Sequence, residues 1–236
     1  MGNKDRSFGL TGNQLKILAL IAMTFDHIGY HLLPQYLVLR IVGRLAMPIF
    51  AWMIAEGCEY TKNRARYFLT MLAFGLVSQV VMWFAAESLM QCIFITFSMS
   101  ILLISVLDLA NRKRGFFTLC LLGITMGAIC YICVFLPKDI PHLGFSVDYG
   151  IYGVLLPVAI YLGRTKPEKL MLAAVVLIPT AIRYGSVQWY ALLSLPLLAL
   201  YNGKRGKARM KYLFYIYYPL HTAVIYGIAY IMSLKR

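Results

Sequence analysis

The feature that most limits how this chain can fold is its series of long apolar runs. Of its 236 residues, 61% are hydrophobic and 14% are charged, and the mean hydropathy is +0.71. A soluble domain carries nearly twice that charged fraction, whereas a membrane-spanning helix needs roughly 20 apolar residues. The composition therefore predicts an all-α protein, a polytopic integral membrane helical bundle whose surroundings are the lipid bilayer.

The apolar runs give about nine transmembrane helices joined by short loops, and together they make up a single domain over residues 1–236. The seventh and eighth runs are short and contain Pro179 and Pro196, so a single merged span is an alternative. The runs lie at 14–33, 36–56, 66–86, 91–109, 116–136, 148–163, 169–182, 187–201 and 212–232.

Basic residues concentrate in alternate connections, at 62–66, 112–114, 164–169 and 204–211. The positive-inside rule places these loops and the N-terminal segment 1–13 in the cytoplasm, with the loops 85–91, 137–150 and 183–186 outside. The net charge of +14 thus marks topology, and we expect no nucleic-acid partner. The predicted location is the cytoplasmic (inner) membrane, with the N-terminus inside and the C-terminus outside.

Several ionisable side chains are expected at membrane depth. A charge there costs about 2.5–3.5 kcal/mol on insertion scales and usually marks function. Taken singly, each also fits a packing role; one Asp, two His and two Arg at similar depth favour a functional cluster. The candidates are Asp26, His27, Arg40, Arg44, Glu56 and His221.

The tight turn between the first two runs puts Arg40 level with His27. Arg40 and Arg44 are four residues apart and share a helix face, so we expect one of them to neutralise Asp26 while the other remains free. Lys16 lies about 16 Å below His27 on nearly the same face of the first helix.

His221 lies about nine residues into the last run, near the middle of the bilayer, where it can meet His27. Tyr217 and Tyr218 precede it by one turn, and Pro219 removes a helical hydrogen bond nearby. A polar notch is therefore expected in the last helix.

This residue set suits acyl transfer. A histidine is the common general base near pH 7, and arginines or a tyrosine can stabilise the oxyanion that forms. Signature motifs of nucleotide hydrolysis, zinc proteolysis and serine hydrolases are missing from the sequence. His27 and His31 have no third ligand placed beside them, so we expect no metal. The alternative is a transporter or permease in which Asp26, His27 and Glu56 relay protons.

Five motifs resemble the TraX family, integral membrane proteins associated with N-terminal acetylation of conjugative pilin. The similarity runs from residue 16 to about residue 225. The motifs are K-x-x-A-x-x-x-M-x-x-DHIG (16–29), R-x-x-GRLAMPIFAWMIAEG (40–57), DYGIYG (148–153), YNGKRG (201–206) and K-x-x-FYIYYP-x-H (211–221).

More distantly, the chain is similar to the integral-membrane acyltransferase 3 superfamily, which acetylates sugars from acetyl-CoA. In that superfamily a basic residue and a catalytic histidine lie on the first helix with ten positions between them. Lys16 and His27 have the same spacing here. The resemblance implies acetyl-CoA as the acyl donor on the cytoplasmic side, and an acceptor outside that is a glycan, a small alcohol or amine, or a protein N-terminus.

The resemblance also implies a role for each matched residue. The catalytic set is His27, Asp26, Arg44, Arg40 and His221; the donor-binding set is Lys16, Tyr217, Tyr218 and Lys211; the acceptor-binding set is Glu56, Asp148 and Tyr149.

Overall fold

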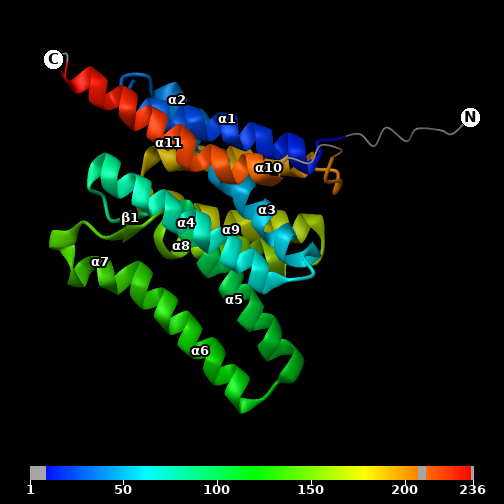
Figure 1. Cartoon of the computed structure of the whole chain (residues 1–236). Helices are drawn as coiled ribbons and strands as arrows, with labels where there is room; N and C mark the ends of the chain where they lie inside the picture. Colours follow the sequence, from blue (N-terminus) through cyan, green and yellow to red (C-terminus); the bar gives the residue numbers. More distant parts are fainter. Residues whose placement is uncertain (1–8, 207–210, 235–236) are drawn as a thin grey trace, which may run out of the picture.

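The computed structural model describes residues 9–206 and 211–234, and nearly all of them are helical (Figure 1). Two short strands are the exception. The elements are α1 (Gly12–His31), α2 (Leu37–Gly43), α3 (Ala46–Tyr60), α4 (Arg64–Ala86), β1 (Met90–Gln91), α5 (Ile93–Lys113), α6 (Phe116–Cys130), η1 (Tyr131–Phe135), α7 (Leu136–Asp139), η2 (Pro141–Leu143), β2 (Ser146–Val147), α8 (Gly150–Leu162), α9 (Lys166–Tyr184), η3 (Ser186–Leu193), α10 (Ser194–Ala199) and α11 (Lys211–Leu234).

Each predicted apolar run is mainly helical, but three of them are divided: 36–56, 116–136 and 187–201, the last into η3 and α10. The run 36–56 is two helices, α2 and α3, which meet at Arg44 and Leu45. Pro48 explains the break, because a proline cannot bond to the carbonyl four residues earlier and its ring clashes with that carbonyl. Pro137 has the same relation to Cys133, and there the helix widens into the π-turn η1.

The protein is a helical membrane protein. Among the described residues, four helical stretches are long and apolar enough to cross a bilayer: Leu37–Tyr60, Arg64–Phe84, Ile93–Lys113 and Phe116–Asp139. Shorter apolar helices occupy Gly150–Leu162, Ser186–Ala199 and Ile216–Met232. The total of nine spans stays a prediction. The seventh and eighth runs are separate here, because η3 and α10 fold back against α9.

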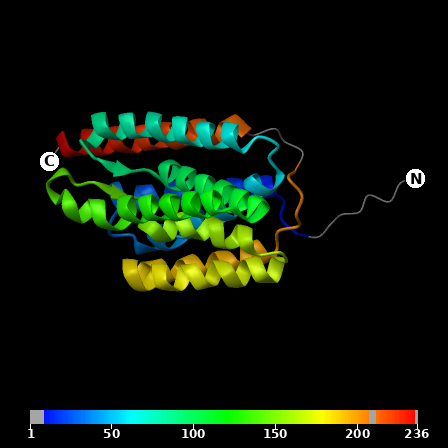
Figure 2. The ribbon, with the colours of Figure 1, turned by 90° about the horizontal axis from the view of Figure 1, so that it is seen from below.

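The centre of the bundle is α3, which packs against α1, α5 and α8 and buries Ile49, Ala51 and Ala55 completely. Figure 2 shows α4 and α11 along one edge and α9 along the opposite edge. At the periphery α6 packs on α5. Only 11% of the most apolar part of the stretch Phe116–Asp139, which begins with α6, is buried inside the protein. The rest of its surface is therefore available for contact with lipid.

The described parts of the basic connections, at 62–66, 112–114, 164–169 and 204–206, lie at one end of the bundle (Figure 2). The amides of Gly12 and Asn13 donate to the carbonyls of Lys204 and Arg205, at 2.8 and 3.0 Å, and Lys166 Nζ donates to the carbonyl of Tyr201 at 2.8 Å. At the other end β1 pairs in parallel with β2, which joins two of the loops predicted to lie outside.

The first and last helices begin at the same end and run in the same direction (Figures 1 and 2). An odd number of crossings requires this arrangement. We therefore expect alkaline phosphatase to be active when fused at the C-terminus or inserted near residue 143, and inactive when inserted after residue 114 or 203. Activity after residue 203 with none at the C-terminus would contradict the topology.

Candidate active site

The polar cluster depends on an unusually close contact between α1 and α2. A Cβ atom added to Gly43 would lie 2.3 Å from the Cβ of Asp26, and one added to Gly29 would lie 2.8 Å from the Cβ of Leu39. Real Cβ atoms do not approach so closely, so only glycine fits at either position. These two glycines bring the α2 backbone against Asp26, and the arginine side chains follow.

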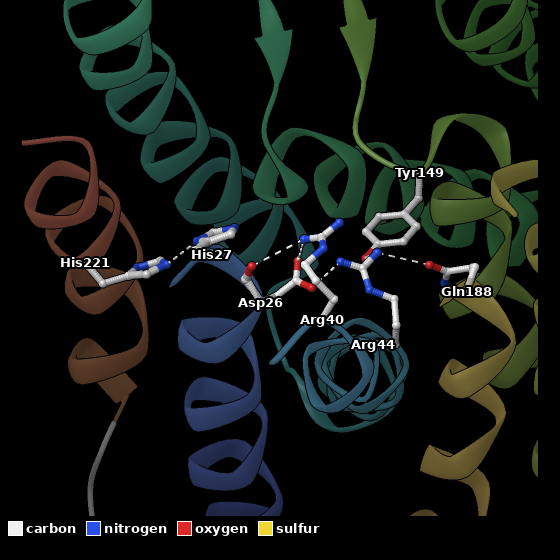
Figure 3. A network of polar contacts seen from close by, with 7 residues as sticks. All are labelled: Asp26, His27, Arg40, Arg44, Tyr149, Gln188 and His221. Atoms are coloured by element: carbon white, nitrogen blue, oxygen red, sulfur yellow. Dashed lines mark hydrogen bonds and ion pairs between the residues drawn. The ribbon is translucent and has the colours of Figure 1, made fainter. Parts of the chain in front are cut away.

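Asp26 is held by both arginines (Figure 3). Arg40 Nη1 lies 2.8 Å from Asp26 Oδ2 and 3.3 Å from the backbone oxygen of Asp26. Arg44 Nη2 forms an ion pair with Asp26 Oδ1. The expectation that one arginine remains free of Asp26 was wrong, because each carboxylate oxygen takes a different guanidinium. The salt-bridged hairpin itself is present.

The two arginines nonetheless differ in their surroundings. Arg44 also donates to Tyr149 Oη at 3.2 Å and to Gln188 Oε1 at 3.1 Å, and its side chain is 11% exposed. Arg40 is 24% exposed and stacks on the ring of Tyr30, with Cζ 4.8 Å from the ring centroid. Arg44 therefore ties α2 to the β2–α8 turn and η3, whereas Arg40 has N–H groups to offer a ligand.

The half-buried His27 and the buried His221 form a hydrogen-bonded pair between α1 and α11. His27 Nδ1 lies 2.7 Å from His221 Nε2, and the ring planes are nearly parallel, with an angle of 3° between them. His221 Nδ1 lies 2.9 Å from the backbone oxygen of Tyr217. The predicted meeting of His27 and His221 is confirmed.

These contacts fix the positions of the protons when both rings are neutral. A carbonyl oxygen can only accept, so His221 Nδ1 must donate to Tyr217. His221 Nε2 then carries no proton and accepts from His27 Nδ1. His27 Nε2 is left unprotonated, and within the described part of the chain no hydrogen bond reaches it. The network thereby assigns a free basic nitrogen to His27.

A cavity of about 690 Å³ lies against this cluster. Its walls come from α1, α2, α3, α5, α11 and the turns before α8 and η3, and residues 184–188 line its predicted outer end. The charged or catalytic candidates among its lining residues are Asp26, His27, Arg40, Arg44, Asp148 and Tyr149. The structure thus brings five predicted polar positions and Tyr149 to one cavity.

A second cavity, of about 110 Å³, lies toward the basic end. Lys16, Arg205 and Asn13 line it together with apolar side chains, and no carboxylate stands among its lining residues. The Lys16 ammonium lies 5.4 Å from the centroid of the Phe214 ring. Two cations facing a cavity without an anion suit a negatively charged ligand.

Comparison with known proteins identifies the family of the chain. The family described as "TraX protein" matches residues 11–229. The chain belongs to the TraX family. Its relatives include a protein of Dichelobacter nodosus named "Probable fimbrial assembly protein FimC, serogroup H1", which is 27% identical over 251 residues covering 94% of this chain and 96% of that protein.

A second relative is shorter in its match. "Uncharacterized protein RP591" of Rickettsia prowazekii is 41% identical over 66 residues, 28% of this chain and 25% of that protein. No solved structure matches. The more distant similarity to the acyltransferase 3 superfamily stays a prediction.

Other positions in the TraX motifs lie away from the outer cavity. Glu56 is not among the residues that line either cavity; it accepts a hydrogen bond of 2.7 Å from Tyr201 Oη near the basic end. Tyr217 bonds through its hydroxyl to Thr24 at 2.7 Å and stacks beside His221, so it holds α11 against α1. The side chain of Lys211 lies outside the described residues.

Two residues at the site escaped the sequence analysis as individuals. Gln188 is 2% exposed and accepts from Arg44, although its helix carries no motif. Arg205 belongs to a basic loop, and the positive-inside rule is enough to explain the charge of that loop. Arg205 lines the second cavity because the loop pairs with the start of α1. Among the described residues no three His, Cys, Asp or Glu side chains gather as a metal site requires.

Replacing Arg44 is expected to destabilise the protein more than replacing Arg40. Arg44→Ala removes three side-chain partners and leaves part of a buried ion pair unmatched, which costs roughly 3–5 kcal/mol. Arg40→Ala is expected to cost less, since Arg40 is more exposed and Arg44 still neutralises Asp26. Thermal unfolding of both variants in lipid nanodiscs measures the difference, and equal losses would contradict the assignment.

Proposed function

We propose that this TraX-family protein is a membrane acyltransferase that moves an acetyl group from acetyl-CoA to a hydroxyl or amine. The donor binds from the cytoplasmic side and the acceptor enters the outer cavity. The observation that carries the proposal is the unprotonated Nε2 of His27, on a residue lining a cavity of about 690 Å³ beside the partly exposed guanidinium of Arg40.

In the proposed reaction the acceptor atom forms a bond to the thioester carbonyl carbon and gives its proton to His27 Nε2. The carbonyl oxygen becomes negatively charged, and the free N–H groups of Arg40 stabilise it. The carbon–sulfur bond then breaks, and the departing sulfur takes the proton from His27. No residue of the chain changes its oxidation state, and His27 returns to its starting tautomer.

His221 acts through His27. Its Nε2 accepts from His27 Nδ1 at 2.7 Å, which keeps the basic nitrogen on the other side of the ring, and it stabilises the imidazolium that forms during transfer. Asp26 plays the same role for the arginines, since it orients both guanidinium groups. Asp26 and His221 are therefore positioning residues in this reaction.

Lys16 and Arg205 supply the charge that a CoA phosphate needs, and they stand at the end of the bundle where the basic loops gather. Lys211 remains an expected contributor on that side, as does Tyr218, which lines the smaller cavity; Tyr217 does not line it. Asp148 and Tyr149 line the outer cavity and are expected to contact the acceptor.

The name of one relative supports a protein acceptor. The Dichelobacter nodosus relative is named a probable fimbrial assembly protein, and the N-terminal amine of a fimbrial subunit is therefore one acceptor that we propose. An envelope glycan or a small alcohol would instead offer a hydroxyl oxygen as the nucleophile. Transfer by this chain in the inner membrane to one of these acceptors is the form of the proposal to test.

A proton-relay permease has less support. Such a relay would use Asp26, His27 and Glu56, but Glu56 accepts from Tyr201 and does not line the outer cavity. Proteoliposomes that move a solute without any covalent change in it would revive this alternative.

The direct test uses purified protein in nanodiscs with radiolabelled acetyl-CoA and three acceptors: a fimbrial-subunit peptide, an amino sugar and glycerol. We expect transfer to at least one acceptor and release of free CoA in equal amount. Mass spectrometry of envelope proteins and glycans from cells with and without the gene then identifies the natural acceptor. No transfer to any acceptor, with no acetyl mass lost in the cells, would overturn the proposal.

His27→Gln is expected to lower the transfer rate by about 10²–10⁴-fold, the usual contribution of a general base. The fold should be retained, because glutamine fills similar space and can donate to His221. Thermal unfolding serves as the control. A variant that transfers at the original rate would place the base elsewhere.

His221→Leu is expected to lower kcat at least tenfold more than His221→Gln does. The reason is that the amide oxygen of glutamine can still accept a hydrogen bond from His27 Nδ1. The KM for the acceptor should stay within about twofold in both variants, since His221 does not line the outer cavity. A purely structural role predicts instead that both variants lose stability and rate together.

A further inference from the structure

The two cavities are separated by four side chains that line both of them: Met23, Phe50, Ile93 and Tyr218. Each comes from a different helix, namely α1, α3, α5 and α11. Three of the four are at most 8% exposed. We call these four side chains the partition.

The partition lies on the route that the proposed reaction requires. Along one face of α1, Lys16 lines the smaller cavity, Met23 belongs to the partition, and His27 lines the larger cavity. Met23 is one helical turn, about 6 Å, from His27 and about 10 Å from Lys16. An acyl group whose donor is bound near Lys16 must therefore pass the partition before it reaches His27.

The four side chains differ in their freedom to move. Tyr218 is fixed by aromatic neighbours: its ring centroid lies 4.8 Å from that of Phe94, 5.4 Å from that of His221 and 6.3 Å from that of His27. Met23 has a flexible thioether chain that adapts to irregular space. Phe50 is only partly buried and packs against the core from its edge. Met23 and Phe50 are thus the movable members.

We propose that Met23 and Phe50 select the acyl donor by the cross-section of its acyl group. This inference rests on the proposed acyl transfer and adds a specificity that the reaction itself does not require. Acetyl groups and short unbranched acyl chains are no wider than the pantetheine chain of CoA that bears them, so they pass between the two side chains. Branched and aromatic acyl groups are held back in the smaller cavity. Chain length matters less, because the larger cavity has room beyond the partition.

The test compares acetyl-, n-butyryl-, isobutyryl- and benzoyl-CoA as donors for purified wild type and for Phe50→Ala and Met23→Ala. We expect wild type to use the first two and to discriminate against the last two. In Phe50→Ala the ratio of benzoyl to acetyl transfer should rise at least tenfold, and in Met23→Ala the ratio for isobutyryl should rise likewise.

Two further variants make the result independent of general loosening. Met53→Ala removes a similar volume from the wall of the smaller cavity alone, and its donor ratios should stay within twofold of wild type. Met23→Phe should narrow the opening, so that acetyl transfer falls at least tenfold while binding of CoA, measured by isothermal titration, stays within twofold.

The outcomes separate this inference from the proposed function. If wild type transfers no acyl group at all, the proposed function fails. If wild type transfers acetyl but the donor ratios of Phe50→Ala and Met23→Ala match those of Met53→Ala, the partition does not select the donor and this inference fails. Should the truncated variants unfold, unchanged acetyl transfer by Met23→Phe would overturn it on its own.

Discussion

The carboxylate of Asp26 is the constraint on which the rest of the site depends. A lone charge inside an apolar bundle is unstable, and removing either guanidinium from such a group leaves a buried charge partly unmatched. Two arginines stabilise the charge of Asp26, Arg40 in α2 and Arg44 directly after it, one for each carboxylate oxygen. Through Arg44 this arrangement extends to Tyr149 and Gln188, so a single aspartate fixes α1, α2, the turn before α8 and η3 relative to one another.

Neutral hydrogen bonds complete what the ion pairs begin. The backbone oxygen of Tyr217 sets the proton on His221, and His221 sets the proton on His27. In a Ser-His-Asp triad a carboxylate holds the catalytic imidazole in its tautomer; here a second imidazole does so without adding a charge. Within the membrane a neutral imidazole avoids the free-energy cost of burying a further charge, because every charge at this depth needs a partner.

Much of this could be predicted from helix geometry and from the depth of each residue in its helix. The spacing of Arg40 and Arg44 placed them on one face, and the tight turn set Arg40 level with His27. The depth of His221 in the last helix placed it beside His27. In each case helix geometry alone converts a position into a location.

What the sequence could not supply were contacts between distant segments with no periodicity of their own. Tyr149 and Gln188 reach Arg44 across 105 and 144 residues, and Arg205 enters the smaller cavity because its loop pairs with the start of α1. The double use of Asp26 was missed for another reason: spacing shows which side chains share a face, but not that two glycines bring the backbones close enough for both to bind.

The pairing of His27 with His221 joins the first helix to the last, 194 residues later. At about 5–20 residues per second of synthesis, roughly ten to forty seconds separate the two on the ribosome. The ion pairs of Asp26 can form as soon as Arg44 is made, so the carboxylate has its partners early, whereas the histidine pair forms last. The imidazole receives its working tautomer only when α11 has entered the membrane, and a chain that stops short never acquires it.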